Sequence, residues 1–567
     1  MSKHSTGRQR PAISGASRED GDARASNVAA GRALSETIRT TLGPKGLDKM
    51  LVTDDGTVVV TNDGASILDR MDVDHPAARA IAEIADQQDR RAGDGTTTAV
   101  MLAGELLAEA EDLLERGLHP TNVVEGYRWA GDRAVESLAE AAVDVDPDDE
   151  ERLREIARTV ITGKWDEEAT EFLAGLAVDT VRSTGASDRV DLETITRKTI
   201  PGRSYYDSER IDGLLIDMES SSTDVVSPGT LPRRVEGATV ALVDDQLTIE
   251  TATGTGTVSV DSPEQLSAFR EYEDEIYEAY VEDIAATGAD AVFCQKGIDD
   301  PVRAMLAREG ILAVERTRQD ELYKLARATG ARYVASTDGL TPAHAGEAAV
   351  LDRRRIGDRE VTVVRGDEDA GQVSLLLRGG TEHVAEETKR LLDDCVYVLK
   401  LAVERRRVVP GGGATEVGLA GTLRKEAAAL DGREQPAAEA FADALEVVPR
   451  TLAETAGLDP IDALVELRAR HHDGGGTAGV AVEDGRVDDV LSRGVLEPLA
   501  VKERAITGAA EAATLLLRVD DVIPTTPNES EEDGHDHDSG PGGLVESTDG
   551  YPWAVGHSMG HDHGHSH

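Results

Sequence analysis

Apolar residues recur three or four positions apart in several long stretches of the chain. The stretch 96–117 carries such a row, made of Ala99, Leu102, Leu106, Ala110, Leu113 and Leu114. This spacing predicts a helix with one buried face. Residues 27–42 and 381–405 show the same periodicity, and each is predicted to form one helix.

Short β-branched runs alternate with these helical stretches. Residues 57–61 predict a strand that leads into the turn Asn62-Asp63-Gly64 and then into a helix from Ala65. Further along, strands are predicted at 239–243, 291–295, 312–315 and 333–335, with helical patterns between them. Alternation of this kind is typical of an α/β unit.

The turn Gly93-Asp94-Gly95 stands directly before the predicted helix that opens with Thr96, Thr97 and Thr98. The first N–H groups of a helix have no internal partner, so this end suits a phosphate. Asp94 would repel a phosphate unless a hard cation such as Mg²⁺ lay between the two. The turn at Asp63 offers a second corner of this type. Either turn is also compatible with an ordinary Gly/Asp turn before a capped helix.

Composition narrows the class of partner. The 567 residues include 109 acidic and 60 basic side chains, which gives a net charge of −49. This charge argues against nucleic acid or an anionic membrane as the main partner. An acid-rich, lysine-poor surface resembles that of proteins from salt-loving organisms, where ions screen the self-repulsion.

Other features of the sequence indicate a cytoplasmic protein. Two cysteines, Cys294 and Cys395, cannot build a disulfide framework, which favours a reducing compartment. We also expect no membrane span and no signal peptide, because no apolar run is long enough and the N-terminus is polar.

Several motifs are similar to those of a known family. TLGPKGLDKMLV, VVVTNDGASIL, QQDRRAGDGTTTAVMLAGELL, VVPGGGATE and GVLEPLAVKERAI resemble, in order and spacing, the group II chaperonins. That family comprises the archaeal thermosome and the eukaryotic cytosolic chaperonin, and the resemblance extends from about Ser26 to Pro524. No GxxxxGK[ST] sequence occurs, so a P-loop ATPase is excluded.

The resemblance implies an ATPase that uses ATP and Mg²⁺. Asp94 would bind Mg²⁺, and Asp63 and Asp394 would position and activate the attacking water. The remaining residues implied to contact ATP are Leu42, Gly43, Pro44, Gly95, Thr96, Thr97, Thr98, Lys164, Gly412, Gly413, Glu497 and Lys502. Considered without the family, Lys164 would be interpreted as a solvated surface lysine.

Helical phase distinguishes the adjacent carboxylates Asp393 and Asp394. Asp394 shares its side of the predicted helix with Leu391, Val398 and Leu401, whereas Asp393 shares its side with lysines and is expected to be solvated. A carboxylate on an apolar side is costly unless a metal, water or partner meets it. Asp394 is therefore the functional candidate, although a bond to a helix end or hydroxyl in the core would also explain it.

The implied architecture is a multi-domain α/β fold. Nucleotide-contacting residues lie near both chain ends, so 27–150 and 405–524 are expected to build one mainly helical equatorial domain. An intermediate hinge domain would comprise 151–212 and 372–404. An apical substrate-binding domain would comprise 213–371, with a helical lid protrusion near 246–275. We expect 1–26 to be flexible and the acidic, His-rich tail 525–567 to be disordered.

The predicted function is that of an ATP-dependent chaperone of the thermosome type. Its partners would be non-native polypeptides and further subunits, identical or paralogous, in stacked rings that are eight- or nine-membered in the family. One alternative is a structural or regulatory subunit with weak ATPase. It stays open because Arg270 stands where the family tends to have an apolar residue in the lid helix, and because the tail is unusual. A metal-storage or metal-sensing role would depend on the tail histidines alone.

Overall fold

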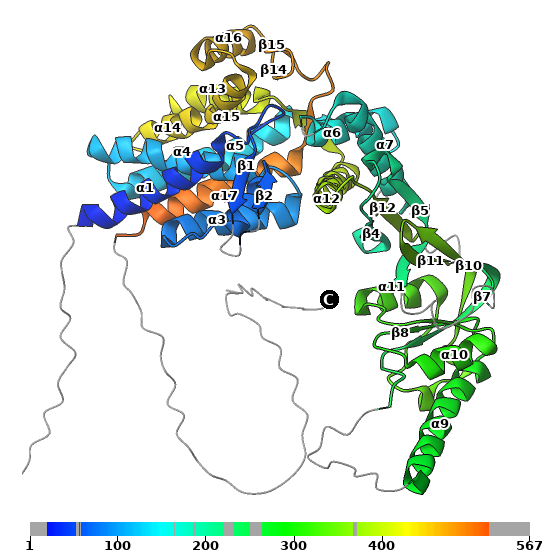
Figure 1. Cartoon of the computed structure of the whole chain (residues 1–567). Coiled ribbons are helices and arrows are strands. Elements are labelled where there is room, and N and C mark those ends of the chain that lie inside the picture. Colours follow the sequence, from blue (N-terminus) through cyan, green and yellow to red (C-terminus); the bar gives the residue numbers. More distant parts are fainter. Residues whose placement is uncertain are drawn as a thin grey trace, which may run out of the picture. The chain divides into compact units, whose positions relative to one another are not determined.

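The computed structural model describes residues 20–52, 56, 58–163, 165–184, 189–218, 231–249, 263–366 and 371–520. All of these lie within one compact unit (Figure 1). The predictions for 1–19, for Lys164, for the lid residues 250–262 and for the tail 525–567 fall outside the described residues.

Helices from both ends of the chain share one hydrophobic cluster, and helix α4 (Thr96–Glu115) lies at its centre. In Figure 1 the blue helices and the yellow and orange helices lie side by side. Small residues allow the close packing: a Cβ on Gly104 of α4 would lie 2.4 Å from the Cβ of Ser35. The other helices of this part are α1 (Asp20–Arg39), α2 (Gly64–Arg70), α3 (Pro76–Ala92), α5 (Pro120–Ala141), α13 (Ala414–Ala427), α14 (Gln435–Leu445), α15 (Val447–Ala456), α16 (Pro460–His472) and α17 (Leu499–Leu517).

Short sheets accompany these helices. Strands β1 (Lys49–Val52) and β2 (Val58–Thr61) form one antiparallel hairpin, and β14 (Ala478–Ala481) and β15 (Arg486–Asp489) form another. A third sheet has the order β16-β13-β3 and consists of Leu496–Pro498, Arg407–Pro410 and Val143–Asp144. It joins the start of α17 to the end of α5.

A second hydrophobic cluster belongs to a smaller α/β part. Helices α6 (Glu150–Ile161), α7 (Glu167–Ser183) and α12 (Glu382–Arg405) contribute to it together with a three-stranded sheet. The sheet has the order β4-β12-β5, from Ile195–Thr199, Val373–Leu377 and Glu209–Asp212. Strand β12 is parallel to β4 and antiparallel to β5.

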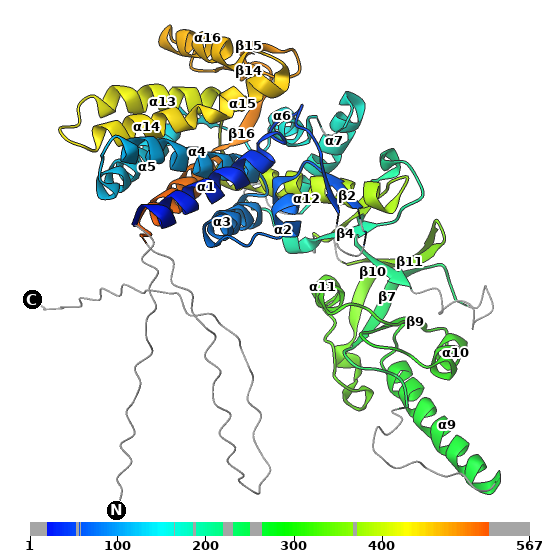
Figure 2. The same cartoon turned by 60° about the vertical axis from the view of Figure 1, so that its left-hand side comes forward.

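The third part is a six-stranded sheet in the order β6-β11-β10-β7-β8-β9. Its strands are β6 (Leu214–Met218), β7 (Arg234–Val243), β8 (Ala291–Cys294), β9 (Leu312–Val314), β10 (Gly346–Ile356) and β11 (Arg359–Arg365). Helix α11 (Gln319–Thr329) covers one face, and α9 (Pro263–Ala286) and α10 (Asp300–Arg308) cover the other (Figure 2). Strands β8 and β9 are therefore buried on both faces.

The predicted multi-domain α/β class is confirmed, and two local predictions are wrong. The strand expected at 333–335 is absent, since Val334 makes only an isolated bridge to Val243. Helix α1 begins at Asp20, so 20–26 are helical where flexible chain was expected. The division into named domains stays a prediction. Among the described helices, none combines the length and apolar character that crossing a bilayer requires.

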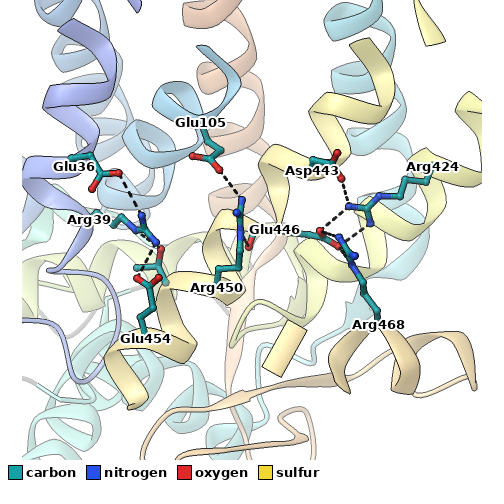
Figure 3. A network of polar contacts seen from close by, with 10 residues as sticks. Glu36, Arg39, Glu105, Arg424, Asp443, Glu446, Arg450, Glu454 and Arg468 are labelled. Carbon is teal, nitrogen blue, oxygen red and sulfur yellow. Dashed lines mark hydrogen bonds and ion pairs between the residues drawn. The ribbon is translucent and has the colours of Figure 1, made fainter. Parts of the chain in front are cut away.

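A network of arginines and carboxylates connects the helices around α4 (Figure 3). The carboxylate of Glu446 is buried and accepts hydrogen bonds from both Arg424 and Arg468. Burial raises the pKa of Glu446, but the two guanidinium groups outweigh it, and the pKa is lowered. In the same network, Arg450 of α15 donates to Glu105 of α4 over 2.7 Å. These charges thus join α4 to helices from the other end of the chain.

The carboxyl group of Glu109, also on α4, should make the stability of the folded chain depend on pH. Burial, together with the charges of Asp443 and Glu105, raises its pKa to about 7. Between the ordinary carboxyl pKa and that value the native state holds a proton that the unfolded chain releases, so stability falls as pH rises through this window. We expect Glu109→Gln to raise the thermal midpoint at pH 8 and to change it little at pH 5.

The matched control for Glu109 is Glu115→Gln, an exposed carboxylate at the end of the same helix. It should leave both midpoints unchanged. Equal midpoints for Glu109→Gln and the parent chain at pH 8, measured by scanning calorimetry at constant ionic strength, would contradict the prediction.

Candidate nucleotide site

A cavity of about 750 Å³ opens beside the start of α4. Its walls come from distant segments of the chain, including 41–44, 62–64, 93–98, 158–163, 165–171 and 480–502. A volume of this size is in the range of small-molecule sites. The cavity is therefore the candidate site, and the question is which chemistry its walls offer.

The N-terminus of α4 faces this cavity without a side-chain cap. Its N-cap residue is Gly95, at φ 83°, and the first helical bond runs from the N–H of Ala99 to the carbonyl of Gly95. The N–H groups of Thr96, Thr97 and Thr98 thus precede the helical hydrogen-bond ladder. Free N–H groups together with the helix dipole favour an anion at this end.

Asp94 stands between the end of α3 and the start of α4. Its Oδ1 accepts a hydrogen bond from the N–H of Gly95 over 2.6 Å, and Gln88 donates to its carbonyl. Gly93 has φ 66°, and a Cβ there would lie 2.7 Å from the Cβ of Tyr397, so the turn requires glycine. The turn thereby holds a carboxylate beside the uncapped end of the helix.

Two carboxylates from distant segments lie on the wall of the same cavity, and we call Asp63 and Asp394 the acidic pair. Asp63 is the N-cap of α2, where its Oδ2 accepts from the N–H of Ser66 over 2.8 Å. Asp394 lies on α12. The guanidinium of Arg390 bonds both, at 3.1 Å from Asp63 Oδ1 and 2.9 Å from Asp394 Oδ2.

A buried ionic triad adjoins the cavity, and two of its members, Glu497 and Lys502, line the wall. The Nζ of Lys502 lies 2.6 Å from Glu416 Oε1 and 2.9 Å from Glu497 Oε2. Burial lowers the pKa of Lys502, but the two glutamates outweigh it and raise that pKa, so the ammonium stays charged. Burial raises the pKa of Glu497. The ammonium group of Lys502 thus forms ion pairs with the carboxylates of both Glu416 and Glu497.

The structure brings most of the predicted site residues to this cavity. The predicted residues that line it are Leu42, Gly43, Pro44, Asp63, Asp94, Gly95, Thr96, Thr97, Thr98, Asp394, Gly412, Glu497 and Lys502. Gly413 does not line it and instead forms the N-cap of α13, where a Cβ would lie 2.7 Å from the Cβ of Pro449. Lys164 lies outside the described residues. The individual roles of these residues stay predictions.

Some residues at the cavity were missed from the sequence. Asp89 of α3 lines the wall, and burial together with the charge of Asp63 raises its pKa. Trp165 also lines it and packs against Tyr205 in a tilted arrangement, with ring centroids 4.4 Å apart. Asp89 precedes Gly93 by four residues, so helical phase could have indicated it. No sequence signal pointed to Trp165.

The expectation that Asp393 is solvated is wrong. Its carboxylate forms an ion pair with Arg197 of β4, and burial raises its pKa despite that partner. The helical phase did separate the two neighbours, because Asp394 lines the cavity and Asp393 does not. Strand β4 packs against the side of α12 that carries Asp393, and the pattern of residues along the helix cannot show this contact.

The fold is that of a known class of protein. Residues 34–527 match the TCP-1/cpn60 chaperonin family, and the chain belongs to that family. A thermosome subunit from Methanopyrus kandleri is 49% identical over 506 residues, which cover 88% of this chain and 92% of that protein. Thermosome subunit 1 of Haloferax volcanii is 45% identical, covering 92% of this chain and 93% of that protein.

A solved structure is similar as well. The open-state monomer of a group II chaperonin from Methanococcoides burtonii aligns with a TM-score of 0.59 and 38% identity. The alignment covers 75% of this chain and all of that one. The resemblance to group II chaperonins is therefore confirmed, and these similarities support an ATP-dependent chaperonin of the thermosome type.

Proposed function

We propose that the chain hydrolyses Mg-ATP in the cavity at the start of α4. The observation that carries this proposal is the meeting of an uncapped helix N-terminus with the acidic pair in one cavity. An anion site beside two carboxylates is the combination that phosphoryl transfer to water requires, since that reaction depends on positioning and charge neutralisation. The ATP phosphates would accept from Thr96, Thr97 and Thr98, and Leu42, Gly43, Pro44 and Gly412 would line the nucleotide.

The donor set fits magnesium. Within the described part of the chain, no group of three or more His, Cys, Asp or Glu side chains is arranged to hold a metal alone. Mg²⁺ characteristically takes one or two carboxylates and completes its shell with substrate phosphates and water. Asp94, fixed beside the helix end, would be the protein ligand. When bound, the ion would neutralise charge on the transferred phosphoryl group.

The acidic pair would act on the attacking water. Asp394 would accept its proton, and Asp63, which comes from a distant segment of the chain, would orient it. Glu497 would accept from the ribose hydroxyls, with Lys502 holding that carboxylate in place. Lys164 and Gly413 remain as further contacts proposed from the family resemblance.

We propose further that hydrolysis drives the folding of non-native polypeptides inside a double ring in the cytoplasm. Residues 27–150 and 405–524 would form the equatorial ATPase domain. Residues 151–212 and 372–404 would form the hinge, and 213–371 the apical domain that binds the polypeptide. The partners would be further copies or paralogues of this chain.

Electron microscopy and ATPase assays on the full chain at high salt test the proposal together. We expect stacked rings whose ATP turnover requires Mg²⁺ and which change shape with ATP. Monomers that never assemble would contradict the chaperonin proposal. Rings without turnover would instead support the alternative of a structural or regulatory subunit in a mixed ring.

The net charge predicts a dependence on salt. With −49 charges per chain, ring assembly brings like charges together, and we propose that the chain is adapted to high salt. Dialysis from about 1 M to about 10 mM salt lengthens the screening distance from about 3 to about 30 Å. We expect the rings to dissociate during this dialysis, as followed by analytical ultracentrifugation. Rings that persist in dilute buffer would refute the adaptation.

A further inference from the structure

Arg390 connects the two members of the acidic pair from behind the cavity wall. Its Nη1 is shared between Asp63 Oδ1 and Asp394 Oδ2, at 3.1 and 2.9 Å. The remainder of the guanidinium is held by Glu387, with Nη2 2.7 Å from Oε1 and Nε 3.2 Å from Oε2. The side chain is only 21% exposed and is not among the described residues that line the cavity.

The bonds to Arg390 join two segments that are far apart in the chain. Asp63 arrives with α2, whereas Asp394 and Arg390 lie one turn apart on α12. Glu387 lies one turn earlier on the same helix, and its two bonds to the guanidinium fix the orientation in which Arg390 faces the aspartates. An arginine fork held in this way offers donors in fixed directions, which a flexible lysine ammonium does not.

Electrostatics give the same residue a second effect. Asp63, Asp89 and Asp394 all lie on one wall, and carboxylates at such separations repel one another. Burial disfavours the charge on Arg390, but the bond to Glu387 and the charges of Asp63 and Asp394 outweigh it and raise its pKa. A permanent cation therefore offsets the mutual repulsion of the acidic pair.

We propose that Arg390 is a positioning residue for ATP hydrolysis, which holds Asp63 and Asp394 at the separation that the attacking water requires. The inference depends on the proposed function of the acidic pair. Arg390 is not among the described residues that line the cavity, so its effect would pass through the two aspartates. Turnover should therefore depend on it more than nucleotide binding does.

The test is steady-state ATPase on the full-length assembled chain. We expect Arg390→Gln to lower kcat at least tenfold while KM for ATP changes less than threefold, and Arg390→Lys to recover part of the loss. The control is Arg405→Gln, which removes an exposed cation from the last turn of the same helix and should leave kcat unchanged. Ring assembly is measured for each variant by sedimentation.

A double-mutant cycle with Asp63→Asn gives an independent readout. If Arg390 acts by holding the pair, its removal should cost less in kcat once Asp63 has lost its charge, so the two losses should not multiply. Losses that multiply, a kcat within twofold of the parent in Arg390→Gln, or an equal loss from Arg405→Gln would each overturn the proposal. If Arg390→Gln fails to assemble, the same measurements are made on Arg390→Lys, and a kcat within twofold of the parent or losses that multiply with Asp63→Asn would overturn the proposal.

Different results would refute the proposed function and the positioning role of Arg390. A parent chain without Mg-ATPase, or one whose turnover survives Asp394→Ala, refutes the role of the acidic pair itself. Turnover that requires Asp394 but is indifferent to Arg390 refutes only the positioning role.

Discussion

Asp394→Ala should lower ATP turnover about a hundredfold while ring assembly and nucleotide binding persist. The carboxylate lies on the cavity wall and shares Arg390 with Asp63, and in the proposed mechanism it accepts a proton from the attacking water. Loss of a positioned general base commonly costs between about 10² and 10⁴ in rate. The measurement is steady-state phosphate release at saturating Mg-ATP, with nucleotide binding followed separately by calorimetry.

The matched control for Asp394 is its neighbour Asp393. Because Asp393 pairs with Arg197, alanine there would leave a half-buried guanidinium without its carboxylate, so asparagine is the appropriate change. Asp393→Asn should keep turnover within twofold of the parent. Robust hydrolysis by Asp394→Ala, or an equally large loss in Asp393→Asn, would contradict the assignment.

Among the substitutions expected to change stability, Lys502→Met should lower the free energy of unfolding the most. It removes the cation that two carboxylates share, and Glu416 is 1% exposed and cannot be rehydrated without opening the core. Removal of one partner from a buried ion pair typically costs about 3–5 kcal/mol, because an uncompensated charge stays behind. We expect a large fall in the thermal midpoint at high salt, together with weaker nucleotide binding.

Two further variants show that the loss comes from unpaired charge. Lys425→Met removes an exposed lysine of α13 and should leave the midpoint near that of the parent. The double variant Lys502→Met/Glu416→Gln also removes the charge of Glu416, the more deeply buried of the two carboxylates, and should be more stable than Lys502→Met alone. A single variant as stable as the parent, or a double variant less stable than the single one, would show that the triad is not the cause.

Local patterns in the sequence predicted the elements that carry the site. The periodicity of 96–117 and 381–405 corresponds to α4 and α12, and α4 begins at Thr96 directly after the Gly-Asp-Gly turn. Both predictions depend on interactions within a few residues, namely helical spacing and the need for positive φ at glycine. The strand expected at 333–335 failed because β-branched and aromatic residues favour an extended chain, whereas a strand also requires a hydrogen-bonded neighbour along its length.

The sequence by itself therefore determined the α/β class, the helix that presents its N-terminus, and the residue types at the anion-binding corner. Only the tertiary structure decided which charged side chains form ion pairs with one another. Arg390 between Asp63 and Asp394, Asp393 against Arg197, and Lys502 between two glutamates are all set by packing between segments far apart in the chain. The physical reason is that helical phase specifies the side on which a residue lies, while its partner and its burial depend on what the fold places opposite that side.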